Sequence, residues 1–333
     1  MFFWTMIVCI LILSTCASFW QTALYGLLTT FPPKFTQAFV TGQGLAGCIV
    51  AVSNFIIAWS QGAPDKQPIK KTMSNMDREA ILYFSVGWCL IAISYLSWTR
   101  FLKMNVVQSY LMKGKESSVS LLATTYDEVN CEVYGLLNNQ QDIEKTQEVV
   151  PTAPSTTLWK RVQGYIVTEF LVFGLTLTIF PALIASLRST SSSSSRLFHD
   201  LWIPLLYVLF NVGDFLGRCS SNIGTRSGSH LATLSLLRWI FVPLFSLCQL
   251  HKTPSFFDND LYPLLFIALV SWSNGYLSSV AFMAFPSKVP SKDQPKAANW
   301  MFLALCTGLT TGSFLSFGLH TLLFPNANFQ FIQ

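Results

Sequence analysis

Eight long apolar runs most constrain what this chain can fold into. As helices rising 1.5 Å per residue, they are long enough to cross about 30 Å of bilayer hydrocarbon. Only 11% of the 333 residues are charged, against about 25% in an ordinary soluble domain. The sequence therefore predicts an all-α, polytopic membrane helical bundle. Its eight expected spans lie near residues 3–30, 37–59, 80–99, 163–186, 201–220, 231–250, 261–285 and 299–323.

The loops between these runs differ in charge. Twelve Lys and Arg residues fall on the side that holds the 101–160 segment, and seven fall on the other side. Because basic loops tend to stay in the cytoplasm, we expect residues 101–160 to form a cytoplasmic, acidic and mobile loop. This loop would separate an incomplete N-terminal lobe of three spans, residues 1–100, from a C-terminal lobe of five spans, residues 161–333.

Cysteine and histidine usage argues against a metal site or a disulfide framework. The eight cysteines fall mostly singly within the spans without a CxxC pair, and the four histidines lie far apart in sequence. They are typical of small buried apolar residues and of span ends. The net charge of +5 includes no dense basic run, so we expect a lipid bilayer as partner and no nucleic acid.

The fifth span, LWIPLLYVLFNVGDFLGRCS, carries an unusual set of polar residues. Each charge costs roughly 2.5–3.5 kcal/mol at the centre of a membrane helix, so such groups face a protein or watery interior. Asn211, Asp214 and Arg218 lie about one helical turn apart on one face. This stripe predicts a polar ligand site or gate within the bundle. A structural ion pair that holds helices together is the alternative interpretation.

Three other polar residues in the expected spans each allow two interpretations. Gln21, near mid-depth, serves either an interhelical hydrogen bond or ligand contact. Glu169 lies near the start of its span, which favours a hydrated carboxylate over a protonatable coupling group. Arg238 either snorkels to the surface or pairs inward.

Small residues recur where helices would pack closely. The run GQGLAG at 42–47 matches the dinucleotide fingerprint GxGxxG, but that fingerprint follows a strand, and this run lies within an apolar span. We interpret its glycines as sites of close helix contact or local bending. In the last span, small residues at every fourth position predict a packing seam: Ala304, Gly308, Gly312 and Ser316.

An enzymatic role finds little support in the sequence. Intramembrane aspartyl proteases use a GxGD motif and a second Asp in another span, whereas residues 211–214 here read NVGD and every other Asp lies in a loop or at a span edge. We therefore expect no catalysis and no cofactor.

Five stretches in series resemble the equilibrative nucleoside transporter family. They are WQTALYGLLTTFPP at 20–33, GQGLAG at 42–47, FNVGDFLGR at 210–218, LRWIFVPLFSLC at 237–248 and SNGYLSSVAF at 273–282. Members of that family have eleven helices in a six-plus-five arrangement similar to the major facilitator fold. They move nucleosides down their gradient by alternating access. On these motifs the chain resembles the family's fourth to eleventh helices.

The resemblance implies a nucleoside site and a location in the plasma membrane. It places Gln21, Asp214 and Arg218 in the central cavity, with Asn211 beside them. Arg218 would donate to sugar hydroxyls, and Asp214 would orient it and accept from the ligand. Aromatic residues such as Tyr207 are candidates to flank the base.

The family's first three helices have no counterpart in this sequence, which leaves alternatives open. We expect either a fragment or incomplete gene model of a working transporter, or a short form with impaired or no transport. Two rival functions remain: a proton-coupled transporter of another small polar solute, resting on Glu169 and Asp214, and a non-transporting membrane protein that associates with partners.

Overall fold

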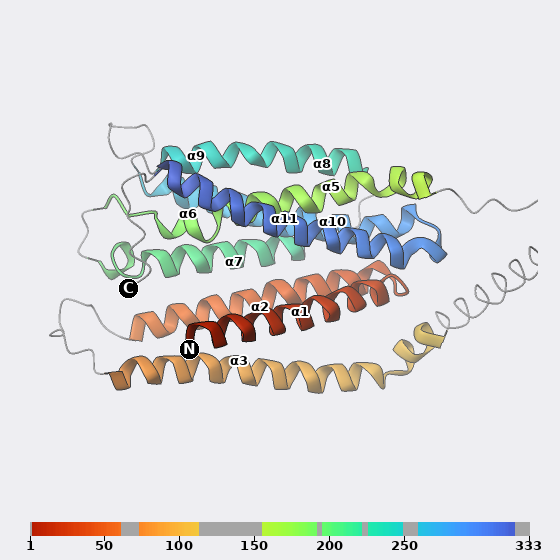
Figure 1. Ribbon diagram of the computed structural model, residues 1–333, viewed down its shortest axis with the longest axis horizontal. Coiled ribbons are helices and arrows are strands. Elements are labelled where there is room, and N and C mark those ends of the chain that lie inside the picture. The colour runs from red at the N-terminus through yellow and green to blue at the C-terminus, as the bar shows by residue number, and fades with distance from the viewer. Residues whose placement is uncertain are drawn as a thin grey trace, which may run out of the picture.

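The computed structural model describes residues 2–60, 73–112, 155–191, 195–221, 226–248 and 259–323. These residues form long helices that run side by side along the longest axis of the molecule (Figure 1). The described residues contain no strand. The predicted all-α bundle is confirmed.

Ten α-helices and four short 3₁₀ helices have both ends within the described part of the chain, and residues 105–112 are also helical. The long helices are α1 (Phe2–Leu28), α2 (Pro33–Ser60), α3 (Met73–Leu102), α5 (Ser155–Ile179), α7 (Trp202–Ser220), α10 (Leu261–Ala284) and α11 (Gln294–Leu323). The short ones are α6 (Ala182–Ala185), α8 (Gly228–Leu237), α9 (Phe241–Leu247), η2 (Arg196–Phe198), η3 (Arg238–Ile240), η4 (Phe285–Lys288) and η5 (Ser291–Asp293).

Helices occupy all eight predicted spans. Among the described residues, six segments are long and apolar enough to cross a membrane: Phe3–Leu28, Pro33–Ser60, Leu158–Ala185, Gly228–Leu247, Leu261–Lys288 and Ser291–Leu323. Helices α3 and α7 cover the third and fifth predicted spans, and three polar side chains lower the mean hydropathy of α7. The chain is therefore an integral membrane protein.

Several predicted boundaries are wrong by up to two turns. Helix α5 begins at Ser155, well before the expected start at 163. It ends at Ile179, shortly before Pro181, whose backbone nitrogen has no hydrogen to donate to a helical hydrogen bond. The predicted loop 101–160 is helical at both described ends, at 105–112 and from Ser155 onward. Residues 113–154, which make up most of that loop, lie outside the described residues.

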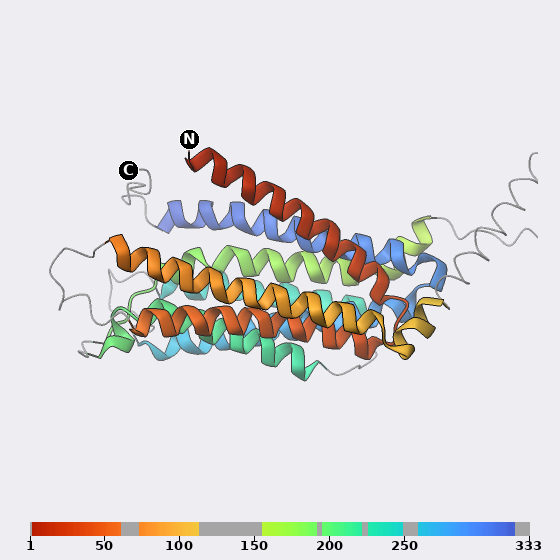
Figure 2. The same ribbon diagram turned by 90° about the horizontal axis from the view of Figure 1, so that it is seen from below.

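The helices divide into two groups along the bundle. Helices α1, α2 and α3 lie on one side and the later helices on the other, and α2 packs against α7 where the groups meet (Figure 1). Figure 2 shows α1 crossing α11 obliquely, and these two helices are also in contact. A buried cluster joins Tyr25 of α1 and Val40 of α2 to apolar residues of α5, α10 and α11.

The predicted seam of small residues in the last span is confirmed. Helix α11 packs against α5, and a Cβ added at Gly308 would lie 2.6 Å from the carbonyl oxygen of Phe170. A Cβ at Gly312 would collide with the carbonyl oxygen of Gly174. Only glycine allows the two backbones to approach this closely.

Candidate functional site

The centre of the candidate site is a buried ion pair on α7. Arg218 Nε donates to Asp214 Oδ2 at 2.7 Å, and each residue is only 8% exposed. The two residues lie four positions apart, so the helix itself brings them together. The predicted proximity of Asp214 and Arg218 is therefore confirmed.

Helix α10 supplies the second partner of the Asp214 carboxylate. Asn274 Nδ2 donates to Asp214 Oδ1 at 2.7 Å, and the Thr176 hydroxyl of α5 donates to Asn274 Oδ1 at 2.6 Å. Both carboxylate oxygens of Asp214 are thus hydrogen-bonded, which offsets much of the cost of burying the charge.

Glycines bring α7 and α10 close enough for these hydrogen bonds. A Cβ at Gly217 would collide with the carbonyl oxygen of Trp272, and a Cβ at Gly275 would collide with the carbonyl oxygen of Asp214. Because the backbones touch here, the short side chain of Asn274 reaches the carboxylate.

Helix α2 closes the other side of Arg218. Arg218 Nη1 donates to the Val40 carbonyl oxygen at 3.2 Å, and a Cβ at Gly44 would lie 2.8 Å from Arg218 Cδ. A Cβ at Gly47 would lie 2.6 Å from Asn211 Oδ1. Gly44 and Gly47, two of the glycines of GQGLAG, therefore make room for the polar stripe of α7. This confirms their predicted role in close helix contact.

Asn211 lies apart from the ion pair, at the edge of a cavity of about 440 Å³. Its Nδ2 donates to the Tyr207 carbonyl oxygen at 2.8 Å, which leaves Oδ1 facing Gly47 of α2. The cavity combines amides with three aromatic rings. Its lining residues are Ala46, Gly47, Val50, Ala51, Asn54, Tyr83, Phe180, Tyr207 and Asn211.

Of the four predicted site residues, Gln21 alone does not belong to α7, and the hydrogen bonds described for this structure do not connect it to that helix. It is half-buried on α1, one turn before Tyr25. Tyr25 instead bridges the two groups of helices. Its hydroxyl donates to Gln43 Oε1 at 3.2 Å, and its ring stacks on Phe282 of α10 with centroids 4.3 Å apart.

Comparison with known proteins shows to which family this chain belongs. Residues 6–321 match the family described as nucleoside transporter. The chain belongs to the nucleoside transporter family. Human equilibrative nucleoside transporter 2 is 29% identical over 91% of this chain and 68% of its own length. Rat equilibrative nucleoside transporter 1 is 27% identical, covering 96% of this chain and 70% of the relative. Rat equilibrative nucleoside transporter 2 is 30% identical over 91% of this chain and 69% of its own length.

Membership of the nucleoside transporter family confirms the predicted resemblance and the predicted class of membrane transport protein. Among the described residues, no group of His, Cys, Asp and Glu side chains is arranged to hold a metal ion. The run 42–47 lies within the continuous helix α2 and does not follow a strand, as the fingerprint for dinucleotides would require.

The prediction that Glu169 is a hydrated carboxylate is wrong. Glu169 is 0% exposed, and its Oε2 accepts a hydrogen bond from the Ser278 hydroxyl of α10 at 3.0 Å. Because α5 begins at Ser155, Glu169 lies about 21 Å along the helix from its first residue. The early start of this helix was not predicted.

Arg238 pairs inward and does not snorkel. It is 4% exposed, its Nε donates to the Ser273 hydroxyl at 2.9 Å, and its Nη2 donates to the Val270 carbonyl oxygen at 3.0 Å. The polar patch at 273–279 thus supplies partners for buried residues on three other elements: Arg238 of η3, Asp214 of α7 and Glu169 of α5.

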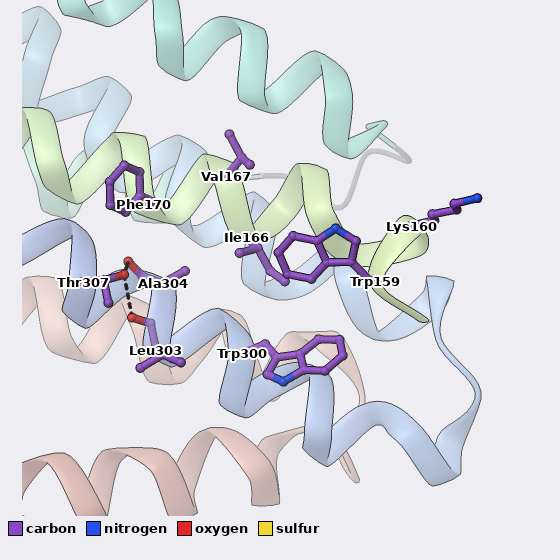
Figure 3. Close-up of a pocket in the computed structure, with 9 residues that line it drawn as sticks. All are labelled: Trp159, Lys160, Ile166, Val167, Phe170, Trp300, Leu303, Ala304 and Thr307. Carbon is purple, nitrogen blue, oxygen red and sulfur yellow. Dashed lines mark hydrogen bonds between the residues drawn. The ribbon is translucent and has the colours of Figure 1, made fainter. Parts of the chain in front are cut away.

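A further cavity of about 740 Å³ lies elsewhere, between α5 and α11. Figure 3 shows the rings of Trp159 and Trp300 close together at one end of it, with Lys160 pointing away. The Thr307 hydroxyl donates within its own helix, to the Leu303 carbonyl oxygen. This apolar groove offers little that recognises a sugar or a base, and exposed walls such as Leu303 are typical of a lipid-facing surface.

Proposed function

We propose that this chain carries nucleosides across a membrane by facilitated diffusion. The observation that carries the proposal is the buried Asp214–Arg218 pair, held on α7 between α10 and α2. Charged groups inside a membrane protein face interior partners or a solute path, and here they lie where the two groups of helices meet. The names of the matched relatives support nucleosides as the solute.

The free hydrogen-bonding capacity of Arg218 suits a sugar. A guanidinium has five N–H donors, and the hydrogen bonds described for Arg218 use its Nε toward Asp214 and its Nη1 toward Val40. The remaining donors form a fork that matches two neighbouring ribose hydroxyls. Asp214 holds the guanidinium in place and offers an acceptor when Asn274 or Arg218 shifts.

The cavity beside Asn211 suits a base. Tyr207 and Phe180 lie in a T-shaped arrangement with ring centroids 5.0 Å apart, and both line the cavity together with Tyr83. Aromatic rings provide stacking surfaces for a planar heterocycle, and the Asn211 amide adds both a donor and an acceptor. We assign the base to this side of the site and the sugar to Arg218.

Alternating access requires the two lobes to separate at the contact between α2 and α7. We propose 1–100 as one lobe and 161–333 as the other, linked by a cytoplasmic segment at 101–160, with Gln21 contributing to the passage when the lobes part. At one end of the contact, Gln37 Nε2 donates to the Ser221 carbonyl oxygen at 2.7 Å. At the other end, Arg196 Nη1 donates to the Trp59 carbonyl oxygen at 2.9 Å.

Uptake of labelled uridine and adenosine tests the proposal in cells that lack nucleoside carriers. The chain should raise uptake without accumulating nucleoside above the external concentration, and surface labelling should place it in the plasma membrane. Asp214→Asn and Arg218→Ala should abolish uptake while leaving the amount of surface protein unchanged. Arg226→Ala, which removes an exposed guanidinium outside the site, is the matched control.

Removing one partner of a buried ion pair costs about 3–5 kcal/mol, so a variant that fails to reach the surface calls for Arg218→Lys. Lysine keeps the charge but not the fork, and uptake should still fall sharply. Full uptake by both Asp214→Asn and Arg218→Lys would overturn the assignment. Accumulation driven by an acid gradient would favour a proton-coupled carrier. Absence of uptake together with co-purification of a longer transporter would favour the partner role.

A further inference from the structure

Glu169 is an acidic residue that the proposed nucleoside site does not use. It lies inside the bundle on α5, and its Oε2 accepts a hydrogen bond from Ser278 of α10. Its Oε1 has no hydrogen-bond partner within the part of the chain that the structure describes. One serine hydroxyl is far less solvation than an ionised carboxylate has in water, so the charged form is poorly accommodated here.

The groups around Glu169 do not neutralise a second negative charge. Arg218 of α7 is the cation whose charge acts on the Glu169 carboxyl, and Arg218 is already paired with Asp214 at 2.7 Å. Tyr25 of α1 is near Glu169, Arg218 and Cys306 of α11. Among other ionisable groups of the packed helices, His230 at the start of α8 is exposed, and Arg238 of η3 donates to Ser273 and Val270.

Tyr25 connects the burial of Glu169 to the closing of the lobes. The Tyr25 ring packs on Phe282 of α10 and near Phe302 of α11, and it is only 5% exposed. Tyr25 belongs to the N-terminal group of helices, whereas Glu169 and Ser278 belong to the C-terminal group. When the lobes separate, Tyr25 leaves this position and water gains access to the carboxyl.

We propose that Glu169 binds a proton each time the lobes close, so that nucleoside movement is gated by protons. This inference rests on the proposed nucleoside carrier. The proton comes from water on the side to which the passage is open, and it returns to water when the passage opens again. In this proposal the structure corresponds to the closed arrangement, in which Glu169 would be neutral. Because closure needs the proton with or without nucleoside, acid speeds exchange in both directions without driving accumulation.

Exchange of labelled uridine in proteoliposomes tests the gate, with the same pH inside and outside. The wild-type rate should fall as pH rises, approaching tenfold per pH unit once the carboxyl is mostly ionised, because one proton is involved. Glu169→Gln keeps an acceptor for Ser278 and is always neutral, so its exchange should be fast and independent of pH. Asp293→Asn, which neutralises a half-buried acid in η5, should behave like wild type.

Infrared spectroscopy of the purified protein gives a reading that does not depend on transport. The wild type should show the carbonyl band of a protonated carboxylic acid, and Glu169→Gln should lack it. A wild-type spectrum without such a band overturns the proposal, whether or not the protein carries nucleosides. Nucleoside exchange with the same pH profile in wild type and Glu169→Gln also overturns it. If the band is present but no nucleoside is exchanged, the proton site stands and the nucleoside function fails.

Discussion

Replacing Asn274 by alanine is the sharpest test of how this site is held together. The change removes the hydrogen bond to Asp214 Oδ1 at 2.7 Å and the acceptor for Thr176 at 2.6 Å. A hydrogen bond to a charged group contributes about 1.5–3 kcal/mol, and an interhelical bond between neutral groups in a membrane contributes about 0.6 kcal/mol. Together they predict a loss of about 2–4 kcal/mol, a factor of about 30 to 900 in the folding equilibrium.

Thermal unfolding in detergent and uridine uptake measure the effect of Asn274→Ala. The thermal midpoint and the rate of uridine uptake should both fall, because Asp214 loses the amide that holds its carboxylate and Arg218 then loses a fixed partner. Thr176→Val should cost far less, because the Thr176 hydroxyl also lies 2.7 Å from the Val172 carbonyl oxygen of its own helix. Adding Thr176→Val to Asn274→Ala should then cost almost nothing more, since their shared bond is already gone.

Asn299→Ala is the matched control, because Asn299 is an exposed amide on α11. If Asn274→Ala equals Asn299→Ala in both thermal midpoint and uptake, the Asn274 amide does not hold the carboxylate and the reasoning fails.

Two further predictions concern the contact between α7 and α10 and the end of the α2–α7 contact that lies near Trp59. Gly217→Ala should prevent α7 from packing on α10 and lower the yield of folded protein, whereas Gly318→Ala should be harmless because nothing lies within 4 Å of the added Cβ; equal yields would contradict this. At the Trp59 end, hydrogen bonding from Arg196 lowers the pKa of Asp200 below its usual 3.8. A carboxyl group whose pKa is lowered in the folded protein stabilises the fold at pH values above its usual pKa. This stabilisation is lost as the pH falls through the lowered pKa. Arg196→Ala should therefore speed hydrogen exchange at 55–60 near neutral pH, and wild type should lose this protection only in strong acid; unchanged exchange would exclude the contact.

The ion pair on α7 was predictable because it is local. A spacing of four residues places Asp214 and Arg218 together on any helix, so the sequence sufficed. The glycines of 42–47 were predictable as packing residues for a similar reason, since an apolar span rules out a nucleotide loop.

The partners from other helices were not predictable in the same way. That Asn274 meets Asp214, or that Ser278 meets Glu169, depends on how far α10 slides along α7 and α5. A single sequence does not fix that register. The error at Glu169 came from the start of α5, because residues 155–161, five of which are polar, form helix where the pattern indicated a loop.

The two kinds of helix contact in this protein differ in what breaks them. Gly217 and Gly275 join α7 to α10, and Gly308 and Gly312 join α11 to α5, through main-chain atoms in direct touch. Pulling those pairs apart would open voids that no rotamer change fills, so we expect α7 to move together with α10 and α11 to move together with α5. Across α2 and α7, Gly44 also lies close to the main chain of Phe215, and in addition long side chains such as Gln37 and Arg218 reach over to carbonyl oxygens. Because such tethers can swing away by bond rotation, we expect the two lobes to separate at this contact.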